Sequence, residues 1–226
     1  MTDSNPNPSR PVEGISSEEP NKLASSIIYT KILQLDRLQY HLKKILFDHT
    51  TANVVVAGGY ITKRLQNEHP NDIDLFFSDR KDIARLILDF RKKLKFKHSY
   101  IGKNLIRGTV EINNKKMKLD LVKRLFQSAK DTLEHFDFTI CCFAITKDTY
   151  CYHVDAPFDL LQKKLNINHI LYPAATMMRL QKYVQRDFTY CKGVVRRIME
   201  KIKKEEVVVG DEFFYEDGVL NFNNID

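Results

Sequence analysis

Three aspartates stand where they could bind a divalent metal ion together. Asp72 and Asp74 belong to the segment DIDLFF (72–77), and Asp120 lies downstream in KLDL (118–121). Alternate side chains of an extended strand point to the same face, so Asp72 and Asp74 share one face while apolar residues fill the other. Two neighbouring carboxylates on a buried strand are costly unless a cation or solvent compensates for their charge. The pattern therefore indicates a cation site.

Magnesium suits these residues, because it prefers oxygen ligands and is usually bound through one or two carboxylates and substrate phosphates. In KMKLDLV (116–122), Met117, Leu119 and Leu121 alternate with Asp120, which predicts a second strand with Asp120 on its polar face. Pairing of the two strands would bring the three aspartates together around two Mg²⁺ ions, with Mn²⁺ as a substitute. Such a trio suits in-line phosphoryl transfer. Alone, an Asp-x-Asp pair also occurs at turns and solvated strand ends.

Two glycines favour the chemical interpretation. NVVVA (53–57) is typical of a buried strand, and Gly58-Gly59 follows it directly, ahead of a helical stretch that ends near residue 67. Glycine lets the backbone approach a ligand, and a helix N-terminus offers amide donors to a phosphate. Lys63 or Arg64, one turn further, could neutralise triphosphate charge. By itself this pattern also fits a tight turn, but Asp72 begins 14 residues after Gly58.

GGYITKRL (58–65), followed by DIDL (72–75), resembles the head domain of the polymerase beta nucleotidyltransferase superfamily, especially CCA-adding enzymes and bacterial poly(A) polymerases. LEHFDFTI (133–140) is similar to the Arg-Asp-Phe-Thr-Ile-Asn-Ala stretch of these enzymes. VDAPFDL (154–160) and the stretch 172–188 resemble their Asp-Pro segment and the Arg-rich helix that opens their neck. The resemblance spans roughly residues 52–190.

The resemblance implies an α/β (α+β) fold, with a nucleotidyltransferase-type mixed sheet flanked by helices and a small C-terminal helical neck. It implies metal-dependent transfer of a nucleoside monophosphate from a nucleoside triphosphate to an acceptor hydroxyl, with release of pyrophosphate. The expected site residues are Asp72, Asp74 and Asp120 as catalytic metal ligands, Gly58, Gly59, Lys63 and Arg64 at the triphosphate, and Asp137 at the nucleotide.

The chain also departs from the family pattern. Thr62 and Lys63 stand where the family usually has Arg and Asp, and Phe136 replaces the Arg before Asp-Phe-Thr. Cys141-Cys142 replaces Asn-Ala. We find no counterpart of the acidic-plus-Arg motif by which CCA-adding enzymes select C and A, so the base that is added does not carry over.

Charge favours an RNA acceptor. The net charge is +7, although residues 205–226 contain seven acidic residues and no Lys or Arg. Basic runs at 91–97, 115–118, 123–124 and 196–204 could follow a phosphate backbone, and a tRNA-like 3′ end is the leading expectation. Any single run also fits a solvated helix face. The alternatives are transfer to a protein hydroxyl, as in toxin or defence-type relatives, and a non-catalytic nucleotide- or RNA-binding module.

Length and composition fit one compact module with a helical appendage. We expect a disordered segment at 1–22, a catalytic head at 23–155, a helical neck at 156–204 and an acidic tail at 205–226. No run of 18 apolar residues and no signal-peptide pattern is present, which predicts a cytoplasmic protein without membrane spans. The four cysteines have no metal-ligand spacing and are expected to be reduced.

Apolar periodicity supplies the expected elements. Helices are predicted at 28–45, 80–94, 174–183 and 188–204, and around Leu160, Leu161 and Leu165. Strands are predicted at 95–101, 105–112, 115–122, 138–145 and 150–154, with Asn113-Asn114 as a hairpin turn and a further turn at Lys147-Asp148.

Overall fold

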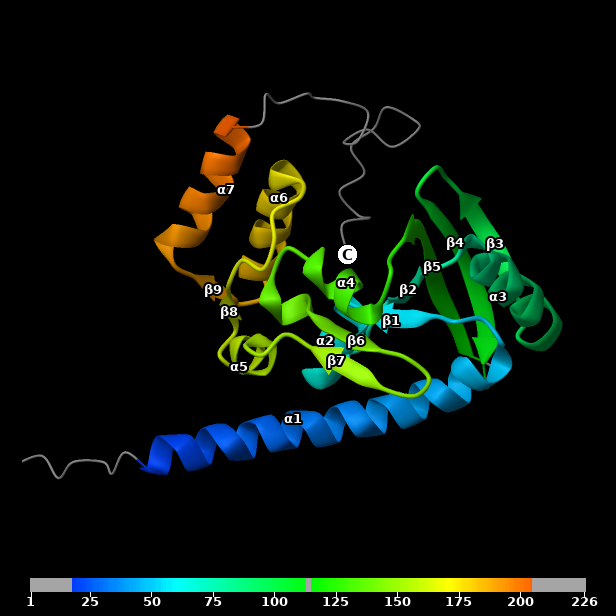
Figure 1. Cartoon of the computed structure of the whole chain (residues 1–226), viewed down its shortest axis with the longest axis horizontal. Helices are drawn as coiled ribbons and strands as arrows, with labels where there is room; N and C mark the ends of the chain where they lie inside the picture. Colours follow the sequence, from blue (N-terminus) through cyan, green and yellow to red (C-terminus); the bar gives the residue numbers. More distant parts are fainter. Residues whose placement is uncertain (1–17, 113–114, 205–226) are drawn as a thin grey trace, which may run out of the picture.

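A mixed seven-stranded sheet forms the centre of the protein (Figure 1). The computed structural model describes residues 18–112 and 115–204. The strand order is β3-β4-β5-β2-β1-β6-β7. Within this sheet of the described residues, β2 and β5 pair in parallel, and the other neighbouring strands pair antiparallel. The strands are β1 (Val55–Ala57), β2 (Asp72–Phe77), β3 (Lys97–Ile101), β4 (Leu105–Ile112), β5 (Lys115–Leu125), β6 (Phe143–Ile145) and β7 (Tyr150–Tyr152).

Helices surround this sheet. A separate, short parallel pair of strands links residues 164–165 to residues 189–190. In Figure 1, α1 runs along the base of the molecule, while α3 and α7 lie at opposite ends of it. The helices and the remaining strands are α1 (Glu18–Ile45), η1 (Phe47–His49), α2 (Gly59–Leu65), α3 (Arg80–Lys93), α4 (Ala129–Glu134), η2 (Thr139–Cys141), α5 (Ala156–Leu161), β8 (Lys164–Leu165), α6 (Pro173–Val184), β9 (Thr189–Tyr190) and α7 (Lys192–Lys204).

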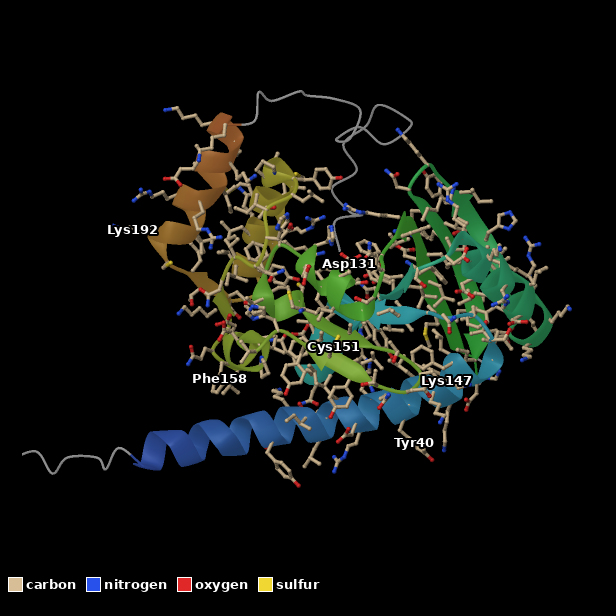
Figure 2. All side chains as sticks on the ribbon, viewed as in Figure 1. Tyr40, Asp131, Lys147, Cys151, Phe158 and Lys192 are labelled. Atoms are coloured by element: carbon tan, nitrogen blue, oxygen red, sulfur yellow. The ribbon has the colours of Figure 1, made fainter. Side chains whose placement is uncertain are left out.

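The main core lies on one face of the sheet, beneath α1, α2 and α3. Ile73, Leu75 and Phe77 of β2 are almost completely buried in it, and so are Leu119 and Leu121 of β5. The helices contribute their apolar stripes to the same cluster, as the alternation of the strands and the periodicity of α1 predict. The opposite side of α1 is solvated: Tyr40 is 61% exposed and projects away from the sheet (Figure 2).

The described part of the chain covers the second face of the sheet only in part. A smaller apolar cluster joins Phe76, Phe126 and Leu133 to residues of β1 and β6. Here α4 packs on β1, β6 and β7, and Asp131 of α4 is visible near the middle of Figure 2. The Phe76 ring meets the rings of Phe126 and Phe136 edge to face, with centroids 5.6 and 5.8 Å apart. In the other half of the sheet, β5 reaches this cluster through the partly buried Val122, whereas no described residue of β3 or β4 belongs to it.

The expected fold class, a mixed sheet flanked by helices, is confirmed. The predicted helix at 80–94 and the strand at 105–112 match α3 and β4 closely. The predicted strand at 115–122 continues to Leu125, and β1, α2 and β3 lie where they were expected. The hairpin turn expected at Asn113-Asn114 lies outside the described residues, as do residues 1–17 and the acidic tail.

Several predicted boundaries are wrong. Helix α1 begins at Glu18 and so takes in residues 18–22, which were expected to be disordered; acidic residues and a proline are tolerated in a first helical turn. In the strand predicted at 138–145, residues 139–141 form a 3₁₀ turn. The Thr139 hydroxyl there donates to Asp159 at 2.5 Å, a side-chain bond that favours a turn over a ladder.

The neck also differs in detail from the expectation. Leu165 lies in β8 instead of a helix, and Thr189 and Tyr190 form β9, so the last helix begins at Lys192. Asp187 has a φ of 64°, which ends the preceding helical region. Helix α4 was not predicted, although Ser128 caps it by accepting from the Asp131 amide at 3.1 Å. Among the described helices, none has the length and apolar character that a membrane crossing requires.

The packing around Gly108 generates a stability prediction. A Cβ atom at this position in β4 would lie 2.3 Å from the Phe96 ring and 2.9 Å from the Lys97 carbonyl oxygen. Overpacking of this kind costs about 1–3 kcal/mol, so Gly108→Ala should lower the free energy of unfolding by that amount in urea titrations. The matched control is Gly193→Ala in α7, where the nearest atom would be 3.5 Å away; equal losses in both variants would contradict the packing argument.

Candidate active site

The parallel pairing of β2 with β5 brings the three predicted aspartates onto neighbouring strands. Asp74 lies directly opposite Asp120 in the register, and Asp72 lies opposite Lys118. Because Ile73 and Leu75, which alternate with the two aspartates, are buried in the core, both carboxylates of β2 point to the other face of the sheet. This is the arrangement that the alternation of charged and apolar residues predicts.

Asp72 and Asp74 line a cavity of about 320 Å³. Its walls come from β2, β5, α2, α4, η2 and α6, so residues far apart in the sequence meet there. The wall contains basic, acidic and aromatic side chains together. The lining residues include Gly59, Lys63, Asp72, Asp74, Arg124, Asp137, Cys141, Arg179, Lys182 and Tyr183.

The two glycines play different structural roles. Gly58 has a φ of 79°, and its amide donates to the Phe143 carbonyl oxygen at 3.2 Å. A Cβ atom at Gly58 would lie 3.1 Å from the Phe136 ring, and 3.9 Å from a carboxylate oxygen of Asp74. Gly59 opens α2 and faces the cavity, with no atom within 4 Å of the position of a Cβ. The open backbone at the cavity wall is therefore that of Gly59.

Lys63 and Arg64 point in different directions. Lys63 lines the cavity. Arg64 is exposed and is not one of the cavity residues; burial lowers the pKa of the His41 imidazole of α1, and the nearby charge of Arg64 lowers this pKa further. Of the two basic residues expected at a triphosphate, only Lys63 lies at the cavity.

Asp120 is held by an arginine that the sequence analysis missed. The Arg107 guanidinium of β4 donates from Nε to Oδ1 at 2.8 Å and from Nη2 to Oδ2 at 2.6 Å, which is a two-pronged ion pair. The side chain of Asp120 is only 7% exposed, and Asp120 is not one of the cavity residues. Counting back along the predicted hairpin from Asn113-Asn114 would have paired Arg107 with Asp120, as the structure does.

The donor set fits a divalent cation at Asp72 and Asp74, because two carboxylates beside a cavity of this size leave room for phosphate oxygens. Asp120, the predicted third ligand, is not one of the residues that line the cavity. Within residues 18–112 and 115–204, no group of three carboxylate, imidazole or thiol side chains gathers closely enough to hold a metal ion. The carboxylate of Asp120 has Arg107 as its counter-charge instead.

Asp137 is likewise paired with an arginine. Arg179 of α6 donates to the Asp137 carboxylate, and both residues line the cavity. The side chain of Asp137 is 7% exposed and that of Arg179 is 39% exposed, so the arginine presents part of its guanidinium to the cavity. Arg179 was not predicted as a site residue. Arg179 lies in the stretch 172–188. The resemblance of this stretch to the Arg-rich neck helix of CCA-adding enzymes could have pointed to an arginine at the site.

Cys141 forms another part of the wall. Its thiol lies 2.8 Å from the Tyr183 hydroxyl of α6. Burial raises the pKa of this thiol to about 11, so the group stays protonated at neutral pH. The thiol therefore contributes packing and a hydrogen bond to the wall.

A family model described as "Gabija anti-defense 2 family protein" matches residues 32–163, which is more than half of the chain. The chain belongs to the Gabija anti-defense 2 family. The matched region includes Asp72, Asp74, Asp120 and Asp137, whereas Arg179 lies beyond it. A protein named Gabija anti-defense 2, from Bacillus phage SPbetaL7, is 28% identical over 150 residues, which are 64% of this chain and 36% of the phage protein. The present chain therefore spans only about a third of the length of the phage protein.

Solved structures of CCA-adding enzymes share the fold. The Thermotoga maritima CCA-adding enzyme complexed with tRNA superposes with a TM-score of 0.53 and 18% identity, over 67% of this chain and 38% of that enzyme. A CCA-adding enzyme in complex with CTP gives a TM-score of 0.56 and 19% identity, over 80% and 44% of the two chains. The expected resemblance to these enzymes is confirmed at the level of the fold.

The ion pair of Arg107 generates a prediction of its own. Arg107→Leu should lower the free energy of unfolding by about 3 kcal/mol, measured in urea with EDTA, because it leaves the buried carboxylate of Asp120 without a counter-charge. Adding Asp120→Asn should restore part of this loss. Arg196→Leu, which removes an exposed partner of Glu200, serves as the control and should change stability little. A double variant as unstable as the sum of its single changes would contradict the pairing argument.

The two glycines provide a second test. Gly59→Ala should fold as stably as the natural chain, yet weaken binding of Mg-ATP about tenfold, which corresponds to 1.4 kcal/mol, because its methyl group enters the cavity. Gly58→Ala should instead destabilise the fold by about 1–2 kcal/mol, because it forces a side chain into a positive φ. Calorimetric titration with ATP and urea unfolding separate the two effects. Undiminished ATP affinity in Gly59→Ala would show that the phosphates bind elsewhere.

Proposed function

We propose that this chain transfers a nucleoside monophosphate from a nucleoside triphosphate to an acceptor hydroxyl and releases pyrophosphate. One observation carries the proposal: Asp72 and Asp74 line the same cavity as the open backbone of Gly59 and the ammonium group of Lys63. Carboxylates for a metal ion, a glycine that permits close approach and a nearby cation are the parts that phosphoryl transfer requires. The fold shared with CCA-adding enzymes supports the proposal of nucleotidyl transfer.

Each residue has a role in this proposal. Asp72 and Asp74 hold Mg²⁺, or Mn²⁺, together with phosphate oxygens of the substrate. When bound, the metal neutralises phosphate charge and makes the acceptor hydroxyl easier to deprotonate. Gly59 admits the triphosphate, with Gly58 shaping the turn before it, and Lys63 compensates for its charge. For Asp120 to act as a third ligand, its carboxylate must exchange Arg107 for the cation.

The nucleoside part of the substrate is assigned to the far side of the cavity. Asp137 and Arg179 present a carboxylate and a guanidinium there, and Tyr183 adds an aromatic wall. A fixed pair of donor and acceptor groups suits recognition of a base or a sugar edge. We retain the division into a catalytic head at 23–155 and a helical neck at 156–204, because both parts line the cavity, the neck supplying Arg179, Lys182 and Tyr183 from α6.

An RNA 3′ end, such as that of a tRNA, is the proposed acceptor, in keeping with the net charge of +7 and with the tRNA bound by the related enzyme. Transfer to a protein hydroxyl is the second candidate, and the family name favours it, since an anti-defense protein has a defense component to inactivate. We propose that nucleotidyl transfer serves such an anti-Gabija role, in the compartment where the acceptor occurs, which we expect to be the cytoplasm.

A label-transfer assay tests the function. The protein is incubated with each α-³²P-labelled nucleoside triphosphate, Mg²⁺, total RNA and a lysate from cells with Gabija defense. We expect labelled RNA that depends on the metal and falls at least a hundredfold in Asp72→Asn and Asp74→Asn, the order of loss seen when a main electrostatic contributor is removed.

Label in a protein band instead would support the second candidate. Absence of label from every product, while Mg-ATP still binds, would overturn nucleotidyl transfer and leave a nucleotide-binding module. The control for a non-specific effect of altered charge is Lys92→Glu, at an exposed position of α3. The activity of this variant should match that of the natural chain.

A further inference from the structure

The face of the sheet that carries Asp72 and Asp74 continues beyond the cavity onto β5, β4 and β3. The strand register shows this continuity. Asp72 of β2 pairs with Lys118 of β5, Lys118 pairs with Thr109 of β4, and Thr109 pairs with Lys97 of β3. Side chains that lie opposite each other in paired strands point to the same face. A single row therefore runs across the sheet from Asp72 to Lys97 at its edge. We call the surface formed by Lys97, Thr109, Lys116, Lys118 and Arg124 the β3–β5 face.

With respect to residues 18–112 and 115–204, the β3–β5 face is solvated. Lys97, Lys116, Lys118 and Arg124 are all exposed. Helix α3 packs against the other side of these strands, where Leu86 and Phe90 meet Leu119 and Leu121 in the main core. On the near side, α4 packs over β1, β6 and β7 at the other half of the sheet. The basic row thus lies beside the covered part of the sheet.

The charge of this face is positive. The two acidic residues that β4 and β5 place on it each have a cationic partner: Asp120 is paired with Arg107, and Glu111 lies 3.4 Å from the Lys95 ammonium group. The exposed cations of the face therefore add to one another. An anionic chain would be attracted to it over its whole width.

The β3–β5 face is continuous with the cavity that Asp72 and Asp74 line, because Arg124 belongs to both. Arg124 lines the cavity, with its guanidinium 5.4 Å from the centroid of the Phe126 ring. Neighbouring strands lie about 4.8 Å apart, so the three steps from Asp72 to Lys97 span roughly 14 Å. A strand of nucleic acid that follows this row can place several phosphates against the face while its end reaches the carboxylates.

We propose that the β3–β5 face is the docking surface for the RNA acceptor, with its phosphate backbone along Lys97, Lys118 and Arg124 and its 3′ end directed into the cavity. The inference rests on the proposed nucleotidyl transfer and adds the route by which the acceptor reaches it. Chemistry favours RNA over a protein occupant, because lysine is depleted from protein–protein interfaces and is a principal ligand of phosphate backbones.

The test measures binding without catalysis. A single-stranded RNA labelled with fluorescein at its 5′ end is titrated with protein by fluorescence anisotropy, at several salt concentrations and without triphosphate. The test variant is Lys97→Glu with Lys118→Glu. Its matched control is Lys81→Glu with Lys92→Glu, which makes the same change of charge at exposed positions of α3, on the other side of the sheet. Circular dichroism and urea unfolding confirm that both variants fold.

We expect the test variant to bind at least tenfold more weakly and to lose about 1.4 units of salt slope, at roughly 0.7 units for each phosphate contact with a single strand. The control should change affinity less than threefold. Equal losses in the two variants, unchanged binding in the test variant, or no RNA binding by the natural chain at 50 mM salt would each overturn the docking surface.

The label-transfer assay separates this inference from the proposed function. If the test variant binds RNA like the natural chain while labelled product still depends on Asp74, the docking surface is wrong and nucleotidyl transfer stands. If RNA binding falls only in the test variant but no labelled product forms under any condition, the surface stands as an RNA-binding face and nucleotidyl transfer is wrong.

Discussion

The parallel pairing of β2 with β5 is the constraint on which the site depends. It is the only parallel pair in the seven-stranded sheet, and its register places Asp74 opposite Asp120. A slip of one residue would turn Asp72 and Asp74 into the core and bring Ile73 and Leu75 to the surface. Because those apolar residues are fully buried beneath α1, α2 and α3, the hydrophobic core fixes the register, and the register in turn fixes where the carboxylates lie.

The four carboxylates of the site have two kinds of surroundings: Asp120 and Asp137 are buried, whereas Asp72 and Asp74 are half-buried. Asp120 and Asp137 are each paired with an arginine from another element, Arg107 and Arg179 respectively. Asp72 and Asp74 border a cavity that a cation and phosphates can enter. A carboxylate buried without a partner would be protonated or would destabilise the fold. The arginine pairs therefore fix the side chains of Asp120 and Asp137, while the position of Asp72 and Asp74 suits an exchangeable ligand.

Local patterns predicted much of this arrangement, and contacts between distant segments account for what they missed. Alternation in 72–77 and 116–122 correctly predicted two strands with aspartates on their polar face. The apolar stripe of α3 also gave its position, because a helix face depends only on neighbouring residues. Arg179 reaches Asp137 across 42 positions of sequence, and nothing local reports such a contact. The 3₁₀ turn at Thr139 was likewise mistaken for a strand, because its hydrogen-bond partner Asp159 lies in a later helix.

Incomplete coverage of the sheet links the fold to the proposed chemistry. One face is closed by α1, α2 and α3, which supply the main core. On the other face, among the described residues, α4 and the cluster around Phe76 cover the half of the sheet next to β1 and reach β5 only at Val122. Closing the remaining half would require an apolar surface on β3, β4 and β5, yet that surface carries Lys97, Thr109 and Lys118. Since one well-packed face already anchors these strands, the other is free to carry charge, and the aspartates lie where the covered and charged halves meet.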